Sequence, residues 1–477
     1  MTVVVETRND FTLEAYRRVA WGGEPVRIAD SAVTVMGESR NRFMRLLERE
    51  PEAVVYGVTT GYGQMAKQRL NPEQRRAHAA RPPHAAAASF GDPLPQRIVR
   101  GIVFTRLVNY VDGYAAISPE LAQGVADMLG GGPLPRVPAY GASSAGEIMG
   151  LAHLFGPLAE RFELGEKDSL CLVNGAPCAA ALVSDALLSA EMRQQLATRA
   201  FALSADAIKA PLDAYDEVLE DLWGDEYEAT VLAALRGLLR GGEPERRSYQ
   251  APVSFRALPR ILGQAARAVA QARTVATTLL RAVSDNPLFV AGDSIHPHGR
   301  MVSNGGFHAA AAAPALDALA AAWADLALVC DRQVNRLLDG QISLLPDFLM
   351  AADGAYIGCL GFVSADYAEQ ARHAAQRTLL PGSDGGGFGQ NDLAVPAFAA
   401  WRKAEESGRC LNANLAILAA VASQALYVTD RTPAPALVPF LSEVRRVFAP
   451  LDSPRAPGPD AGALADHFTR SVYAAKR

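Results

Sequence analysis

Residues 140–154 read Y-G-A-S-S-A-G-E-I-M-G-L-A-H-L, a run of small residues followed by an acidic residue and an apolar stretch. Gly146 tolerates backbone dihedrals that other residues avoid, and Glu147 stands where the positive end of a helix favours negative charge. The apolar residues from Ile148 onward continue the helix. The pattern predicts a tight turn feeding a helix N-terminus, whose backbone N–H groups can face an anion. The alternative is an ordinary small-residue loop.

Length and composition limit the class of protein. The 477 residues suffice for one large domain or two to three ordinary ones, and 49% apolar with 20% charged residues is usual for a soluble globular protein. A net charge of −5 without a basic run argues against a nucleic-acid or membrane partner. Five cysteines without a C-x-x-C pair indicate buried thiols in a reducing compartment. The N-terminus is unlike a signal peptide and no apolar span looks long enough for a membrane helix, so we expect a cytoplasmic location.

The apolar spacing predicts a mainly α-helical fold. Residues 33–47 form one expected helix, and the Gly-rich loop V-V-Y-G-V-T-T-G-Y-G follows at residues 54–63. Long Ala- and Leu-rich segments, apolar on most faces, predict helices buried in a bundle: residues 179–206, 259–282, 306–338, 365–377 and 412–427. We therefore expect a loop-rich N-terminal part (residues 1–205) and a central long-helix bundle with C-terminal helices (residues 206–477), joined as one continuous domain.

Short polar or Gly-containing segments lie between and within the expected helices. In chain order they are Tyr56-Gly57-Val58-Thr59-Thr60-Gly61-Tyr62-Gly63, Arg106 with Asn109, Asn174-Gly175, Gln250 with Ser254, Arg256, Pro259 and Gly263, Val283, Asp285-Asn286-Pro287, Phe307-His308, and Gln390 with Asp392. Together, from about residue 12 to residue 392, they resemble the histidine/phenylalanine/tyrosine ammonia-lyase and aminomutase family. The resemblance implies a helical bundle of the histidine ammonia-lyase (fumarase/aspartase-like) type. It also implies a homotetramer with active sites shared between subunits.

The resemblance assigns roles to individual residues. It implies catalytic roles for Tyr56, Gly63, Asn174 and Arg256, with Tyr56 as the base and Arg256 as a clamp for a substrate carboxylate. It implies substrate-binding roles for a second set: His78, Gln250, Phe307, Asn391, Ser144, Ala145 and Gly146.

The chain departs from the family at the residues that make its electrophile. Members form a methylidene-imidazolone ring from an Ala-Ser-Gly triad, and the matching residues here are Ser144-Ala145-Gly146. Ala145 has no hydroxyl to lose as water. Shifting the register to residues 142–144 restores a central serine but places a side chain where crowding favours glycine. Three further departures are Ala77, Val253 and Asn391, which replace serine, tyrosine and glutamate of family members. The ring is predicted not to form, and no other cofactor and no metal is expected.

Three functions stay open on this sequence. The first is an enzyme on the lyase scaffold that uses Tyr56 for elimination, conjugate addition or cyclisation on an activated, amino-acid-derived small molecule of biosynthesis. Without the ring the β-proton of an ordinary amino acid is too weak an acid for such a base. The second is a conventional aromatic amino-acid ammonia-lyase or aminomutase, with the triad in another register. The third is a non-catalytic subunit that binds a ligand in the retained pocket.

Overall fold

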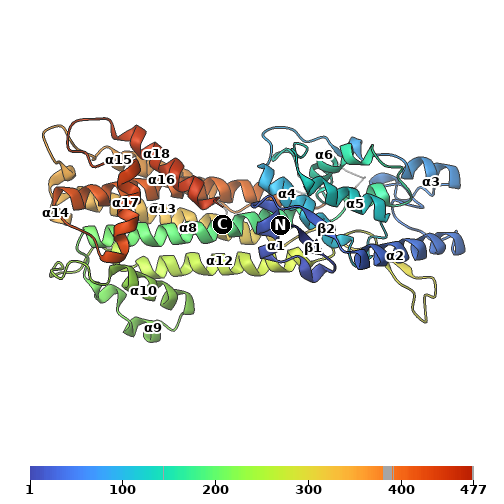
Figure 1. The fold of residues 1–477 in the computed structure, drawn as a ribbon, viewed down its shortest axis with the longest axis horizontal. Coiled ribbons are helices and arrows are strands. Elements are labelled where there is room, and N and C mark those ends of the chain that lie inside the picture. The colour runs from blue at the N-terminus through green and yellow to red at the C-terminus, as the bar shows by residue number, and fades with distance from the viewer. Residues whose placement is uncertain (143, 380–388, 390, 475–477) are drawn as a thin grey trace.

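The computed structural model describes residues 1–142, 144–379, 389 and 391–474 and has an elongated, mainly helical shape (Figure 1). Four long helices run along the long axis: α8 (Pro177–Ala207), α12 (Leu258–Arg281), α13 (Ala312–Leu338) and α16 (Ala397–Val428). The N-terminal elements gather at one end of this bundle (Figure 1). The predicted mainly α fold with a long central bundle is confirmed.

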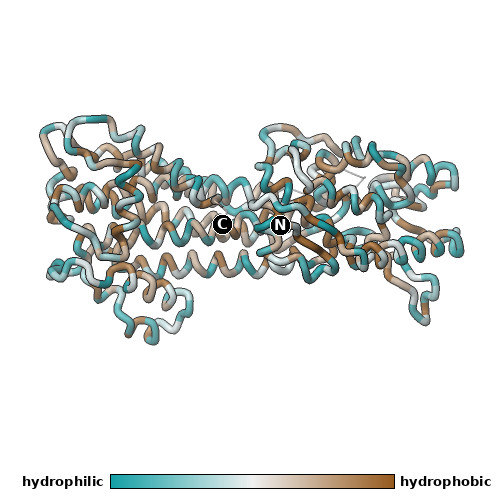
Figure 2. The backbone as a smooth tube through the Cα atoms, in the orientation of Figure 1, coloured by the Kyte–Doolittle hydropathy of each residue, from teal (hydrophilic) through white to brown (hydrophobic). Residues whose placement is uncertain are grey.

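Small apolar residues form the contacts inside the bundle. In α8 the side chains of Ala179, Ala190 and Ala197 are fully buried. Alanine loses no side-chain entropy on burial, and its small size lets helix backbones approach closely. Hydrophobic residues recur along the turns of the long helices (Figure 2), as helices buried on most faces require.

By length and composition alone, three helical stretches could cross a membrane: Asp168–Ala207, Ala312–Leu338 and Ala397–Val428. The prediction that no apolar span is long enough for this was wrong. The most apolar windows of the three stretches are 100%, 61% and 89% buried inside the molecule, respectively. Their composition is therefore accounted for by packing within the bundle.

The N-terminal end combines short strands with shorter helices. β1 (Val3–Val5) pairs in parallel with β2 (Val26–Ile28). The helices are α1 (Leu13–Ala20), α2 (Asp30–Arg49), α3 (Pro72–Ala79), α4 (Gln96–Arg106), α5 (Pro119–Asp127), α6 (Ile148–Ala159) and α7 (Asp168–Val173). Between α2 and α3 the chain is irregular except for one short 3-10 turn, as predicted for the Gly-rich loop at residues 54–63.

Shorter elements surround the bundle. They are α9 (Val218–Trp223), α10 (Glu226–Leu239), α11 (Val253–Arg256), α14 (Gly340–Ser343), α15 (Leu360–Ala374), α17 (Val438–Val447) and α18 (Pro457–Val472). β3 (Leu288–Val290) and β4 (Arg300–Val302) form an antiparallel hairpin in which Leu288 faces Val302. The boundary predicted near residue 205 falls inside the unbroken helix α8.

Three helix starts and the hairpin differ from the prediction. α15 begins at Leu360 instead of residue 365. α13 begins at Ala312 instead of residue 306, because the Gly306 N–H donates to Asn304 Oδ1 (2.7 Å) and holds this segment in a turn. α16 begins at Ala397 instead of residue 412. Charged residues between Arg402 and Arg409 interrupt the apolar pattern of the helix, so the pattern alone shows only its second half. The hairpin has strands of three residues, too short for a period of two to be recognised.

All five cysteines are free thiols. Cys171, Cys178, Cys330 and Cys410 are buried, as expected, whereas Cys359 is exposed. The expectation of buried thiols is thus wrong for Cys359 alone.

Candidate functional site

The small-residue segment before α6 is the predicted tight turn. Gly141 and Gly146 have φ of +71° and +156°, values that favour glycine. The Ser144 hydroxyl donates to the Gly146 carbonyl oxygen across 2.5 Å, so it is engaged inside the turn. Ala145, between Ser144 and Gly146, carries only a methyl group. Ser143, part of the alternative register, lies outside the described residues.

Glu147 caps a different helix from the one it begins. Its fully buried carboxylate accepts the N–H groups of Cys178 (2.5 Å) and Ala179 (2.7 Å), in the first turn of α8. Burial raises the pKa of Glu147 to about 7, although the two backbone donors act in the opposite direction. The turn at residues 144–146 is thereby tied to the N-terminus of α8.

Three of the polar segments that the sequence singled out meet behind this turn. Asn174 Nδ2 donates to the Asn286 carbonyl (2.8 Å), and the buried Arg106 guanidinium donates to the Asn174 carbonyl. The Ser284 N–H donates to Asn109 Oδ1 (2.7 Å). Segments far apart in the chain therefore form one hydrogen-bonded group, and Asn174 lies within it.

A buried ion pair supports this group. Lys167 Nζ donates to Asp285 Oδ2 (2.5 Å) and to the Ala115 carbonyl (2.8 Å), and lies 3.3 Å from Cys171 Sγ. Burial, the largest single effect, lowers the pKa of the Lys167 ammonium, but Asp285 and Cys171 together outweigh it and the pKa lies above its ordinary value. The sequence reading missed Lys167, since a single lysine before α7 carries no local signal.

Phe307 and the segment after residue 391 lie against the turn. A Cβ placed on Gly146 would be 3.5 Å from Phe307 Cδ2. The Val395 N–H donates to the Ser144 carbonyl (2.9 Å), so the chain that follows residue 391 runs beside the turn. Residues 380–388 and 390 lie outside the described residues, and they include Gln390 of the matching motif.

The loop at residues 54–63 brings a second set of predicted residues together. The Tyr56 hydroxyl oxygen accepts the Gly63 N–H (3.1 Å). Asn391 Nδ2 lies 3.8 Å from the position of a Cβ on Gly63. A backbone N–H directed at a phenol oxygen stabilises negative charge there, which is the property a tyrosine base needs.

Tyr62, which the sequence reading did not assign to the site, connects Tyr56 with His78. Its ring meets that of Tyr56 edge to face, at an interplanar angle of 65° (centroids 6.2 Å apart), and packs on the His78 imidazole with centroids 4.4 Å apart. Burial lowers the pKa of His78, and the nearby Arg81 lowers it further. Both effects favour the neutral imidazole, which can accept a hydrogen bond at one ring nitrogen.

Gln250 and Arg256 lie elsewhere in the same chain. Arg256 ends α11, where its Nε donates to the Ala251 carbonyl (3.0 Å). The 24 residues of α12, about 36 Å long, separate α11 from the group around Ser284. One chain thus brings Tyr56, Gly63, His78 and Asn391 together. Arg256 stands apart from them, at the other end of α12.

Comparison with known proteins identifies the family. Residues 11–161 and 159–446 match the family described as aromatic amino acid lyase. The chain belongs to this family. A histidine ammonia-lyase from Streptomyces avermitilis is 30% identical, with 98% of this chain and 96% of that protein covered. One from Symbiobacterium thermophilum is 29% identical, covering 97% and 96%. These relatives are carbon–nitrogen lyases. The aromatic amino acid lyase family is therefore a family of enzymes.

Solved structures of the same fold cover nearly the whole chain. The ergothioneine-degrading enzyme ergothionase from Treponema denticola superposes with a TM-score of 0.89 at 20% identity, covering 99% of each chain. Tyrosine aminomutase from Streptomyces globisporus gives 0.88 at 24% identity, covering 99% of this chain and 98% of its own. At these identities the likeness establishes the aromatic amino acid lyase fold.

Proposed function

We propose that this protein is a lyase-fold enzyme that works without the methylidene-imidazolone group. Tyr56 is its base, and it carries out elimination, conjugate addition or cyclisation on an activated, amino-acid-derived small molecule. The observation that carries the proposal is the Tyr56 hydroxyl facing the Gly63 N–H, in the same chain as a turn whose central residue is Ala145.

The family's prosthetic group does not fit the residues of this turn. The methylidene carbon derives from a side chain that loses a hydroxyl, and Ala145 has none. The neighbouring Ser144 has a hydroxyl, which is held by the Gly146 carbonyl. No step of the proposed reaction therefore passes through the ring.

Without that electrophile, the substrate has to supply the activation. A phenol base removes a proton that is already acidic, or one from a nucleophile that adds to an unsaturated carbonyl. Amide N–H groups stabilise the oxyanion that develops. Asn391 lies beside Gly63, which places its amide for this role. Asn174 uses one Nδ2 hydrogen and its Oδ1 within the chain. Asn174 acts mainly as a positioning residue.

The carboxylate clamp comes from another subunit in this proposal. Arg256 uses Nε for the Ala251 carbonyl, and among the described residues its two Nη groups have no hydrogen-bond partner. The length of α12 keeps it from Tyr56 of its own chain. A homotetramer with shared sites, as the resemblance implies, unites Arg256 and Gln250 of one copy with Tyr56 of another. The five free thiols are in keeping with a cytoplasmic location.

The mass of the proteolytic peptide containing residues 140–154 tests the absence of the ring. We expect the unmodified mass and no ammonia released from histidine, phenylalanine or tyrosine. A deficit of two waters, about 36 Da, together with ammonia release, would instead establish a conventional ammonia-lyase or aminomutase. The 30% identity to histidine ammonia-lyases favours that second candidate.

Substitution tests the base. On a substrate found by screening unsaturated acids, Tyr56→Phe is expected to lower turnover at least about 100-fold. The matched control Tyr62→Phe removes a hydroxyl from the adjacent ring and should cost far less. Full turnover by Tyr56→Phe would exclude the base role, and binding that no pocket variant converts into a rate change would indicate a non-catalytic subunit. Mixing Tyr56→Phe with Arg256→Gln subunits should restore activity that neither variant has alone.

A further inference from the structure

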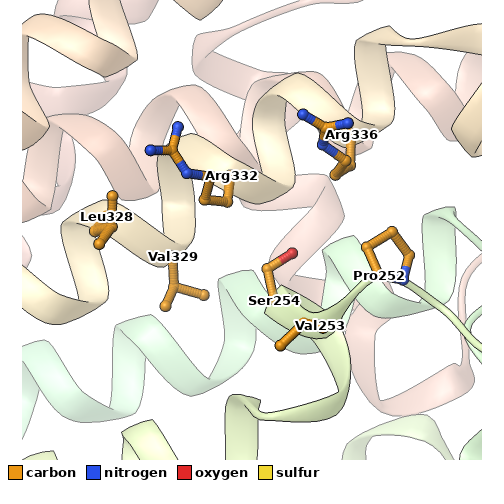
Figure 3. Close-up of a pocket in the computed structure, with 7 residues that line it drawn as sticks. All are labelled: Pro252, Val253, Ser254, Leu328, Val329, Arg332 and Arg336. Atoms are coloured by element: carbon orange, nitrogen blue, oxygen red, sulfur yellow. The ribbon is translucent and has the colours of Figure 1, made fainter.

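The segment that leads into α11 carries two of the predicted site residues, Gln250 and Arg256. Between residues 247 and 256 it contains a single phenol, that of Tyr249. Where α11 begins, Val253 lines a cleft of about 340 Å³ toward α13 and offers no polar side-chain atom (Figure 3). An arginine keeps its proton and a serine hydroxyl is a very weak acid. Tyr249 is therefore the side chain of this segment that can exchange a proton.

Arg247 fixes the start of the segment. Its N–H donates to the Lys209 carbonyl just after α8 (3.1 Å), and its Nη2 donates to the Ile342 carbonyl in α14. Arg247 is only 9% exposed, and within the described residues its Nε and Nη1 have no hydrogen-bond partner and no carboxylate lies within ion-pair distance. A buried cation without a counter-ion costs free energy. A negative charge beside this guanidinium would therefore be stabilised.

The side chain beside this guanidinium is the phenol of Tyr249. Arg247 Nη2 donates to the Tyr249 hydroxyl oxygen (2.7 Å), and Arg247 Cζ lies 4.6 Å from the centroid of the ring. The oxygen acts as an acceptor here, and its own hydrogen has no acceptor in the described part of the chain. Tyr249 is 51% exposed, which leaves it open to a ligand. Once its proton is transferred, the phenolate becomes the counter-ion that Arg247 lacks.

We propose that Tyr249 is the general acid of this enzyme and acts opposite the Tyr56 base. The inference rests on the proposed function, in which Gln250 and Arg256 of one copy reach Tyr56 of another. Tyr249 directly precedes Gln250, so it belongs to the segment that enters the shared site. Elimination and conjugate addition each remove a proton from one atom and deliver a proton to another, which a separate acid and base can do together.

Each reaction conserves protons. In an addition, the Tyr56 phenolate takes the proton of an amine or hydroxyl while the nitrogen or oxygen lone pair bonds to the β-carbon of an unsaturated carbonyl compound. The π electrons of the double bond move onto the carbonyl oxygen as an enolate, and Tyr249 gives its proton to the α-carbon. In an elimination, Tyr56 takes the acidic proton and Tyr249 protonates the leaving group. Tyr56 ends with one proton more and Tyr249 with one fewer, and exchange with water restores both.

Addition of ammonia to benzoylacrylate tests this inference, because the probe has a carboxylate for Arg256 and a ketone that activates the double bond. The absorbance of the conjugated probe falls as the addition proceeds. Tyr249→Phe should lower kcat about 100-fold with a much smaller change in KM, since the acid acts in the transition state. The matched control Tyr227→Phe also removes a hydroxyl from a ring that lies against an arginine (Arg267 Cζ at 4.8 Å) and should keep the wild-type rate.

Mixed oligomers, made by co-expression, show which copy supplies Tyr249. Tyr249→Phe subunits combined with Tyr56→Phe subunits rebuild sites that contain both phenols, and they should recover about a quarter of the wild-type turnover. Tyr249→Phe combined with Arg256→Gln should stay inactive, since one copy supplies both of these residues to a site.

Two results would overturn the inference: a Tyr249→Phe rate equal to that of the Tyr227→Phe control, or recovered activity in the mixture with Arg256→Gln. Failure of the proposed function has a different signature. Full turnover by Tyr56→Phe refutes the base, and a wild-type protein that does not accelerate the addition counts against the proposed function as a whole. An unimpaired Tyr249→Phe beside an impaired Tyr56→Phe refutes the acid alone.

Discussion

Replacing Asp285 with asparagine tests the buried ion pair beneath the candidate site. Asp285 and Lys167 are both fully buried, and Asp285 Oδ2 lies 2.5 Å from Lys167 Nζ. Arg106 Nη2, also buried, lies 3.9 Å from Asp285 Oδ1. Asparagine at this position keeps the shape of the Asp285 side chain and removes the negative charge that Lys167 and Arg106 share. Breaking a buried pair in this way costs about 3–5 kcal/mol, and the second cation places Asp285→Asn toward the upper end of that range.

A double variant separates the lost attraction from the unpaired charge. Lys167→Met combined with Asp285→Asn leaves no lysine to be stranded, so it should recover more than half of the stability that Asp285→Asn loses. Urea unfolding followed by far-ultraviolet circular dichroism, at one protein concentration and pH 7.5, measures the difference between variants.

An exposed ion pair supplies the control. Glu369 and Arg372 lie 2.6 Å apart on α15, with more than half of each side chain exposed. Glu369→Gln should leave the urea midpoint unchanged, since solvent screens such pairs. The reasoning is refuted if Asp285→Asn unfolds at the midpoint of this control, or if the double variant is no more stable than the single one.

Three further predictions concern the turn, the tyrosine loop and the thiols. The pKa of Glu147 rises from 4.5 to about 7 on folding, so the stability it contributes is full below pH 4.5 and is lost as the pH rises through 7. Between pH 4.5 and pH 7 the wild-type protein should lose about 3 kcal/mol of unfolding free energy through this group, and Glu147→Gln should not. The prediction is contradicted if the urea midpoint changes equally between pH 5 and pH 8 in the wild-type protein and in the variant. Gly57→Ala places a Cβ 2.5 Å from the Tyr62 ring at a φ of +67°. It should displace that ring, change the near-ultraviolet dichroism and lower turnover at least about tenfold; an unchanged spectrum would count against the described packing. Ellman's reagent should label Cys359 alone in the folded protein and all five cysteines in denaturant; fast labelling of Cys171 would show that its burial is wrong.

Local patterns were sufficient for most of the fold. Long Ala- and Leu-rich segments predicted α8, α12, α13 and α16, because a helix buried on most faces needs small apolar residues all round. The starts of α13 and α16 were misplaced where a side-chain turn at Asn304 and charged residues between Arg402 and Arg409 interrupted the apolar pattern. The three apolar stretches that could span a membrane by composition show the limit of such patterns, since burial, not composition, distinguishes a bundle core.

Local sequence was sufficient to predict the helical bundle, the tight turn at Gly146 and the Gly-rich tyrosine loop, and it shows that Ala145 has no hydroxyl. Each of these depends on residues that are neighbours in the chain. Which segments meet depends on tertiary packing. The Ser284 N–H reaches Asn109 across 175 residues, and Glu147 caps α8 instead of its own helix. Tertiary packing also determines that α12 holds Arg256 away from Tyr56 of the same chain. Periodicity and turn chemistry act over a few residues, whereas such contacts depend on how whole helices pack.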